Sequence, residues 1–158
     1  MNCFTSVDGE ALLLYAQWTD EAARAGFSAN RDAGIAAVPA FGPVRYRVYR
    51  SLSPAAVARR PTSLVTATFD VDGPERQRHI ADALCRAATG IPPHPAGLGS
   101  HFHLSRDGTR VLDYTEWNDD AAHDVLMDDG AFDEIYRLST ETPGVRATRG
   151  RQYTCTAV

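Results

Sequence analysis

The chain repeats part of its own sequence, and this repeat limits the possible folds more than any other feature. Residues 6–23 read SVDGEALLLYAQWTDEAA, and residues 105–122 read SRDGTRVLDYTEWNDDAA. A Ser, an Asp-Gly pair, a Tyr, a Trp and an Ala coincide in the two segments without a gap. Self-similarity of this kind indicates two copies of one structural unit.

Both copies show the pattern of a strand, a hairpin, a second strand, a helix and a third strand. The Asp-Gly pairs stand between runs of alternating apolar residues, which predicts two-residue hairpin turns at Asp8-Gly9 and Asp107-Gly108. A capping type of residue after each Trp opens an Ala-rich segment that is typical of a helix. The predicted helices are Glu21–Phe27 and Asp120–Met127, and the predicted closing strands are Val44–Ser51 and Val145–Thr156.

The second copy has two further elements in front of it. Ser63–Val71 is rich in β-branched residues and predicts a strand. Gln77–Thr89 has apolar residues at the spacing of an amphipathic helix. This copy therefore has the β-α-β-β-α-β order of a ferredoxin-like unit. We predict an α+β fold, with a shortened repeat over residues 1–51, a linker over 52–62 and a complete repeat over 63–158.

Composition limits the classes of partner. The formal net charge is −4, so neither nucleic acid nor an anionic membrane surface is expected as the main partner. No stretch approaches the roughly 18 apolar residues of a membrane span, and no secretory signal is seen, so we expect a cytoplasmic protein. The three cysteines, Cys3, Cys85 and Cys155, are odd in number and far apart, which favours reduced thiols.

Residues 107–117, DGTRVLDYTEW, followed by Ala122-His123, resemble the antibiotic biosynthesis monooxygenases of the dimeric α/β-barrel group. The resemblance extends over most of 63–153 and, more weakly, over 2–51. It implies two four-stranded sheets that close face to face into a pseudo-dimeric barrel, with helices outside and a pocket on the inner face. In oxygenases of this family, the pocket takes a phenolic, often polyketide-derived substrate, which O2 oxidises with no metal or flavin.

Hairpin geometry sorts the candidate side chains onto two faces. One face collects Phe102, Leu104, Val111, Asp113, Thr115 and Trp117, and the other collects His101, His103, Leu112, Tyr114 and Glu116. Sequence alone does not tell which of the two faces lines the pocket, so both sets stay candidates.

Asp113 and Trp117 are the pair to which the family resemblance points. In family oxygenases an Asn stands at the position of Asp113 and, together with Trp, orients the substrate. Asp at this position adds a negative charge, or a general base if burial raises its pKa. The first copy has Leu14 and Trp18 here, so we expect the chemistry in the second copy. The alternative is that both Trp residues only pack in the core.

Three histidines are further catalytic candidates. His101 and His103 stand at alternate positions of one strand, where they could transfer protons. Metal binding there would need a third ligand, from Glu116 or from the distant His123 or His79, and no metal site is predicted. His123 comes early in the predicted helix, where some family members place a phenolic or imidazole group near the substrate. The alternative for His123 is an exposed helix residue.

Three other side chains are candidates for substrate binding. Tyr114 and Phe102 lie on the same two strands as the histidines. Arg146 lies on the closing strand, and an Arg suits a phenolate or carboxylate because it stays charged and donates in a fork. An arginine that only forms surface ion pairs is the alternative.

From these residues and the resemblance we expect a cofactor-free monooxygenase that acts on an aromatic polyketide or another phenolic compound with O2. A cyclase that folds a polyketide in the same pocket is one alternative, and a non-catalytic small-molecule-binding or accessory protein is another. The shortened first copy leaves a sheet edge without a neighbour, and such edges pair with other chains, so we also expect a homodimer. A start of the chain further upstream is the alternative explanation of that edge.

Overall fold

The computed structural model describes residues 2–31, 44–53, 60–148 and 150–154. The first part of the chain forms β1 (Asn2–Ser6), β2 (Leu12–Tyr15), α1 (Glu21–Arg31) and β3 (Tyr46–Leu52). The second part forms β4 (Ser63–Val71), α2 (Pro74–Gly90), β5 (Gly97–Ser105), β6 (Arg110–Trp117), α3 (Ala122–Asp128), α4 (Asp133–Glu141), β7 (Val145–Ala147) and β8 (Arg151–Thr154). Most of the predicted linker, residues 54–59, lies outside the described residues.

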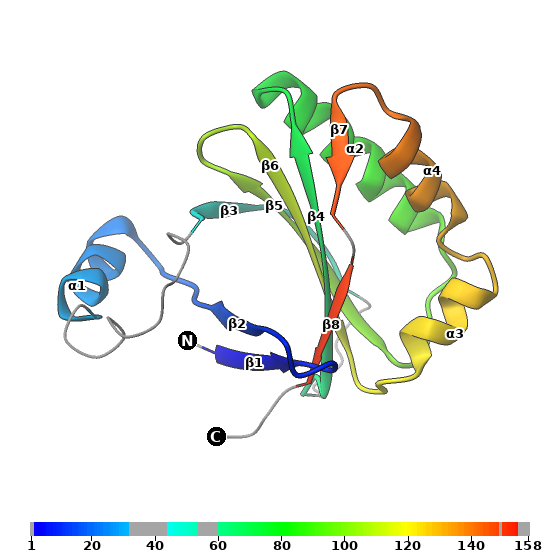
Figure 1. The fold of residues 1–158 in the computed structure, drawn as a ribbon, viewed down its shortest axis with the longest axis horizontal. Coiled ribbons are helices and arrows are strands. Elements are labelled where there is room, and N and C mark those ends of the chain that lie inside the picture. Colours follow the sequence, from blue (N-terminus) through cyan, green and yellow to red (C-terminus); the bar gives the residue numbers. More distant parts are fainter. Residues whose placement is uncertain (1, 32–43, 54–59, 149, 155–158) are drawn as a thin grey trace.

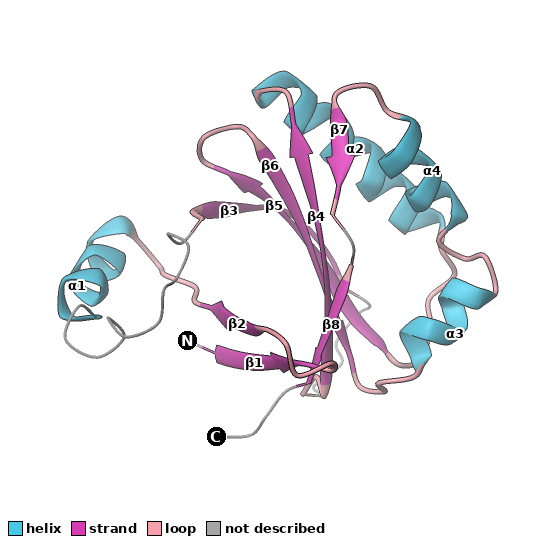
Figure 2. Cartoon of the chain, in the orientation of Figure 1, coloured by secondary structure: helices cyan, strands magenta, loops and turns pink. Residues whose placement is uncertain are grey.

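All the strands belong to one curled, 8-stranded sheet with the order β2-β1-β8-β4-β6-β5-β3, and β7 pairs with β4 beside this path. The neighbouring strands are antiparallel. Helices α2, α3 and α4 cover the convex face, whereas α1 lies apart, on the concave side (Figures 1 and 2). The α+β ferredoxin-like architecture is confirmed, but the two expected sheets are one continuous sheet.

The order of the strands differs between the two copies. In the second copy, the opening strand β4 lies between β8 and β6. A first copy built in the same way would have a strand between β3 and β2, and no described strand lies there. In the described part of the chain, β2 and β3 are accordingly the two ends of the sheet and do not pair with each other. The expected homodimer, which rests on such edges, stays a prediction.

The main hydrophobic core lies between the convex face of the sheet and the helices. Pro74 stands at the start of α2, where its missing N–H costs no hydrogen bond. The apolar side of α2 packs on the sheet through Ile80 and Leu84, which meet Phe102 and Val111. Helix α4, which the sequence analysis did not predict, adds Ile135 and Leu138 to this core, at the i, i+3 spacing of one helix face.

Two of the three cysteines lie in the described part of the chain. Cys3 is exposed and Cys85 is buried, and both are free thiols, as expected. Burial raises the pKa of the Cys85 thiol to about 11, so it stays protonated at neutral pH. Cys155 lies outside the described residues.

The sequence repeat is also a repeat of hydrogen bonds. Ser6 Oγ donates to Asp8 Oδ1 at 2.5 Å, and Ser105 Oγ donates to Asp107 Oδ1 at 2.6 Å. In each copy the backbone N–H five residues after the serine donates to the serine oxygen, at 2.8 Å in the first copy and 2.9 Å in the second. The matching serines and aspartates therefore close both hairpins in the same way.

The predicted register of the second hairpin is confirmed, but its turn is longer than predicted. Phe102 lies opposite Asp113, and His101 lies opposite Tyr114. Strand β5 ends at Ser105 and β6 begins at Arg110, so the connection runs over residues 106–109 instead of the Asp-Gly pair alone. Gly108 has a φ of +78° and donates its N–H to the carbonyl of Ser105 at 3.2 Å.

The predicted last strand, Val145–Thr156, is divided into β7 and β8. Ala147 lies opposite Phe69, whereas Arg151 lies opposite Thr66, so the closing strand has one residue more than β4 over this stretch. An extra residue on one strand is a β-bulge, which bends the strand and interrupts its pairing. Residues 155 and 156 lie outside the described residues.

Replacing Ser105 by Ala should lower the free energy of unfolding by about 2 kcal/mol. This buried hydroxyl also accepts a bond from Gln77 Nε2 at 3.1 Å, so its loss removes one more buried hydrogen bond than the loss of Ser6, although Gln77 keeps the carbonyls of Ser105 and Arg110 as acceptors. Ser6→Ala is the matched control, because Ser6 makes the same turn bonds without a glutamine, and it should cost about 1 kcal/mol. Urea denaturation measures both values, and equal losses in the two variants would contradict the role given to Gln77.

Candidate functional site

The two faces of strands β5 and β6 line two different cavities. A cavity of about 370 Å³ lies between the convex face of the sheet and the helices, and we call it the helix-side cavity. A cavity of about 1240 Å³ lies on the concave face, and we call it the interior cavity. Asp113 and Trp117 line the helix-side cavity, whereas His103 lines the interior cavity. The expected pocket on the inner face is therefore present, but Asp113 and Trp117 lie on the other side of the sheet.

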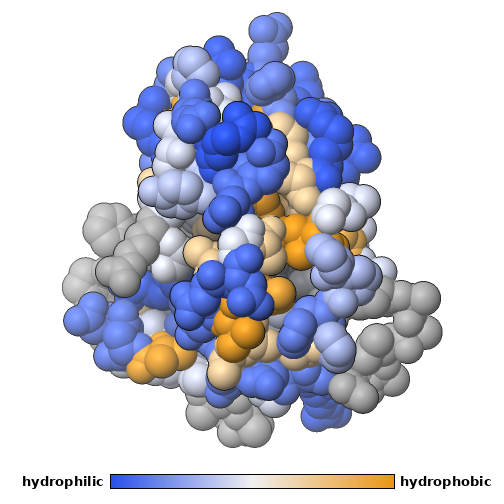
Figure 3. Space-filling view, turned by 90° about the vertical axis from the view of Figure 1, so that its right-hand side faces the viewer, coloured by the Kyte–Doolittle hydropathy of each residue, from blue (hydrophilic) through white to orange (hydrophobic). Residues whose placement is uncertain are grey.

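The helix-side cavity has mainly apolar walls. The sheet contributes Ser100, Asp113, Thr115 and Trp117, the loop after α2 contributes Ile91, Pro92, Pro93 and His94, and the helical side contributes Leu126, Phe132 and Ile135. Figure 3 shows the outer surface of this side of the molecule, which is mostly hydrophilic with hydrophobic side chains gathered in its middle.

Among the ionisable groups that line this cavity, Asp113 has the pKa that departs most from its ordinary value. It is partly buried in the cavity wall, and the loss of hydration raises the pKa of its carboxyl from the ordinary 3.8 to about 6. A hydrogen bond from Ser100 Oγ to Asp113 Oδ1, 3.0 Å long, and the nearby charge of His101 act in the opposite direction. A carboxyl with a pKa of about 6 exchanges protons readily near neutral pH, as a general acid or base requires.

Trp117 lines the cavity with its ring while its N–H group is engaged in a hydrogen bond. The indole Nε1–H donates to Thr115 Oγ1 at 3.2 Å, while only 6% of the residue is exposed. His94 lies 6.3 Å from the Trp117 ring, centroid to centroid. Aromatic faces of this kind bind a flat ligand by stacking.

His123 is packed into the aromatic wall and is not the exposed helix residue of the alternative interpretation. Its ring stands edge-on to Trp117 at 5.7 Å and stacks on Phe132 at 5.4 Å. Burial lowers the pKa of His123 below its ordinary 6.5, although the neighbouring Asp124 acts against this shift. His123 is therefore mainly neutral at pH 7, and it can support Trp117 from behind the cavity wall.

The other candidates do not gather around this cavity. His101, His103 and Tyr114 lie on the concave face, where His101 Nε2 is 3.8 Å from a Glu116 carboxylate oxygen. Phe102 is fully buried in the main core. Arg146 is exposed, donates to Asp72 at 2.9 Å and lines neither cavity.

Sequence reasoning missed Ser100 and His94 in this site. Ser100 lies opposite Thr115 and diagonally across from Asp113, so the hairpin register alone could have placed it beside the carboxyl. His94 stands in a proline-rich loop, and no periodic pattern in the sequence connects that loop to Trp117. No group of three or more histidine, cysteine or carboxylate side chains in the described residues could hold a metal ion. None of the described helices is both long and apolar enough to cross a membrane.

Comparison with known proteins adds one relative in sequence. No family model matches the chain. Over 49 residues the chain is 39% identical to the tetracenomycin-F1 monooxygenase of Streptomyces glaucescens, a match that covers 30% of this chain and 44% of the relative. The chain therefore matches less than half of that protein's length.

Two solved structures resemble the whole fold. An anthrone oxidase-like protein superposes with a TM-score of 0.72 and 18% identity, over 98% of this chain and 75% of its own. A major regulator of staphylococcal pathogenesis superposes with a TM-score of 0.65 and 10% identity, over 99% of this chain and 84% of its own. At such identities the likeness concerns the fold alone, and the two neighbours show that this fold serves different functions.

Asp113→Asn should stabilise the protein at pH 8 and leave its stability unchanged near pH 4. Because the folded state raises the pKa of Asp113, folding favours the protonated carboxyl, and stability is lost as the pH rises from about 4 through about 6. The neutral amide escapes this loss, which corresponds to a gain of about 1–3 kcal/mol at pH 8. Urea denaturation at both pH values measures it, with Asp128→Asn, an exposed carboxyl on α3, as the control. Equal effects at the two pH values would contradict the shift.

Proposed function

Starting from its kinship with the antibiotic biosynthesis monooxygenases, we propose that this chain is a monooxygenase and that the helix-side cavity is its active site. The substrate is an aromatic polyketide or another phenolic compound, and O2 oxidises it with no metal or flavin. The observation that carries the proposal is Asp113, a carboxyl of pKa about 6 in a cavity with apolar and aromatic walls.

The cavity suits a flat aromatic substrate in size and lining. Its volume of about 370 Å³ lies in the range of roughly 300–1,000 Å³ that is usual for small-molecule pockets. Trp117 and Phe132 supply aromatic surface, and Leu126 and Ile135 supply aliphatic surface on the helical side. A substrate stacked on Trp117 would bring its polar edge to the same sheet face as Asp113, four residues earlier on β6.

The chemistry needs a base and an electron-rich substrate. In an anthrone, Asp113 takes a proton from the acidic CH2 group, and the resulting carbanion gives one electron to O2. The substrate radical and superoxide then join in a C–O bond. When the O–O bond breaks, one oxygen stays as the new carbonyl and the other leaves as water, which carries away both hydrogens of the CH2 group. The apolar walls keep bulk water away from the carbanion.

The relative in sequence supports this assignment. Its name states a monooxygenase activity, which agrees with the presence of a base in a cavity with aromatic walls. Because the match covers 44% of that protein, the activity of the present chain rests on the geometry around Asp113 together with this likeness.

Asp113 also supports a second function, cyclisation of a polyketide. A carboxylate that removes an acidic C–H proton can start an aldol closure, and that reaction consumes no O2. The position favours such a role because Asp replaces the Asn of the family oxygenases, so a base stands where they have an amide. Oxygen uptake separates the two reactions.

Oxygen uptake with anthrone, by protein treated with a chelator, tests the proposal. Asp113→Asn should lower kcat/KM by about 10²–10³-fold, because it removes the base while preserving the shape of the side chain. Trp117→Phe should act mainly on KM, since it reduces the stacking surface. Asp128→Asn should leave uptake unchanged. Absence of uptake, with anthrone still bound, would replace the oxygenase by a cyclase or a binding protein.

The rate should rise with pH as Asp113 loses its proton, with a midpoint near its pKa of about 6. Ser100→Ala removes the hydrogen bond that holds this pKa down, so the midpoint should move to higher pH. The dependence of kcat/KM for anthrone on pH measures both effects. An unchanged midpoint in Ser100→Ala would show that another group controls the rate.

A further inference from the structure

The interior cavity has no part in the proposed reaction, although it is the larger of the two. Its walls come from both copies of the repeat, with β2 and β3 on one side and β4 and β5 on the other. It lies on the concave face of the sheet, next to the two sheet ends that no described strand connects. Such a cavity, with polar groups converging on it, is a candidate ligand site in its own right.

A tyrosine of the first copy and a histidine of the second form a hydrogen-bonded pair in this cavity. Tyr15 Oη lies 3.0 Å from His103 Nε2, and His103 Nδ1 lies 2.9 Å from the carbonyl oxygen of His101. A carbonyl only accepts, so Nδ1 carries the proton, Nε2 is the acceptor and the Tyr15 hydroxyl donates to it. Burial lowers the pKa of His103, which keeps the ring neutral in this arrangement.

The Tyr15 oxygen keeps room for one further donor. Gln17 Nε2 donates to it at 2.9 Å and occupies one of its two acceptor positions. The proton of Tyr15 is already used by His103. A hydroxyl group of a ligand can therefore donate to Tyr15 Oη, with His103 fixing the orientation of the tyrosine.

The walls around this pair suit a flat aromatic molecule. Tyr15 stacks on Tyr114, with centroids 4.7 Å apart and an angle of 21° between the ring planes. Tyr46 stands edge-on to His103 at 6.4 Å, and Leu112 adds aliphatic surface. Rings arranged in this way offer both faces and edges to a planar ligand.

The charges around the cavity favour an anion. Its lining includes the arginines Arg24, Arg47, Arg78 and Arg106, and the acids Asp20 and Glu21. Glu21 already pairs with Arg24 and Arg106. Arg47 and Arg78 form no ion pair in the described part of the chain. Arg47 pairs with Leu104 of the helix-side face and Arg78 belongs to α2, so their charge is available to a ligand only at the edge of the cavity.

We propose that the interior cavity is a second binding site, for a planar aromatic compound that carries both a hydroxyl group and a negative charge. The hydroxyl donates to Tyr15 Oη, the rings lie along the tyrosines, and the charge lies towards Arg47 and Arg78 at the edge of the cavity. The site is separate from the helix-side cavity, because the same strands present opposite faces to the two ligands.

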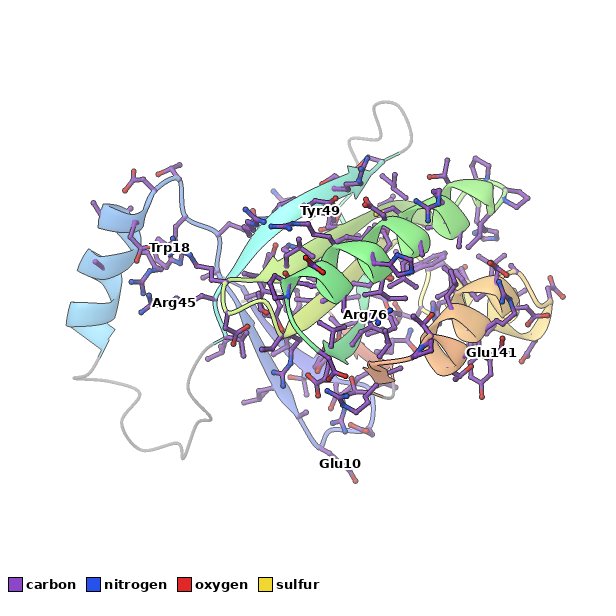
Figure 4. The ribbon with its side chains drawn as sticks, turned by 90° about the horizontal axis from the view of Figure 1, so that it is seen from above. Glu10, Trp18, Arg45, Tyr49, Arg76 and Glu141 are labelled. Carbon is purple, nitrogen blue, oxygen red and sulfur yellow. The ribbon has the colours of Figure 1, made fainter. Side chains whose placement is uncertain are left out.

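Each cavity has one of the two tryptophans of the chain in its wall. Trp18 lines the interior cavity, whereas Trp117 lines the helix-side cavity. Figure 4 shows Trp18 beside α1, on the side towards the strands. In a Trp117→Phe background, the remaining Trp18 fluorescence follows binding from the wall of the proposed site, and substitutions in that site assign the signal to it.

The test is a titration of Trp117→Phe protein with alizarin, a dihydroxyanthraquinone that ionises near neutral pH. The fluorescence of Trp18 should fall to a plateau as alizarin is added. Tyr15→Phe in this background should weaken binding roughly 3–10-fold through the loss of one hydrogen bond. Arg47→Ala should weaken it as well, through the loss of charge. Tyr136→Phe, an exposed tyrosine on α4 that lines neither cavity, is the matched control and should leave the affinity unchanged.

The dimethyl ether of alizarin lacks both the hydroxyl group and the negative charge, so it measures stacking alone. It cannot donate to Tyr15, so Tyr15→Phe should not change its binding. Because energy transfer reaches across both cavities, the effect of Tyr15→Phe, rather than the quenching alone, decides the result. Linear quenching without saturation, or equal affinities in the Tyr15→Phe and Tyr136→Phe variants, would overturn the second site. The Trp18→Phe variant reports on the helix-side cavity, and its result stands independently.

Discussion

The antiparallel pairing of β5 with β6 is the constraint on which both cavities depend. Side chains alternate between the two faces of a strand, so the register decides which groups can meet. With Phe102 opposite Asp113, the carboxyl lies under the helices, and His103 and Tyr114 lie on the concave face. A shift by one residue would exchange the two sets and bury the wrong side chains. The hydrogen bonds of Ser105 at the end of the hairpin hold this register.

The helices turn one face of this hairpin into a chemical site. Packing of α2 and α4 on the sheet removes water from Asp113 and raises its pKa, while Ser100 limits the rise. The ionised carboxyl costs stability in this position, and no ion pair offsets that cost in the described structure. Its retention agrees with a role in proton transfer, since structural carboxyls are more often solvated or paired.

The two copies show how one motif takes two roles in different surroundings. Trp117 is packed under helices of its own copy and is 6% exposed, whereas its counterpart Trp18 is 38% exposed and lines the interior cavity. Leu14, the counterpart of Asp113, is half exposed. Helix α1 lies apart from the sheet (Figure 1). The first copy instead extends the sheet at both ends and encloses the interior cavity.

Sequence by itself determined the repeat, the ferredoxin-like order, the position of α2 and the pairing of Phe102 with Asp113, because periodicity and turn residues act locally along the chain. It also singled out Asp113, Trp117 and His123. It left undecided which face of the hairpin the helices cover, and it missed α4, the bulge between β7 and β8, and the contact of Tyr15 with His103. Only the tertiary structure decided these features, because they depend on packing between segments far apart in the chain. The pKa of Asp113 also depends on the tertiary structure, because its carboxyl loses water only when the helices pack on the sheet.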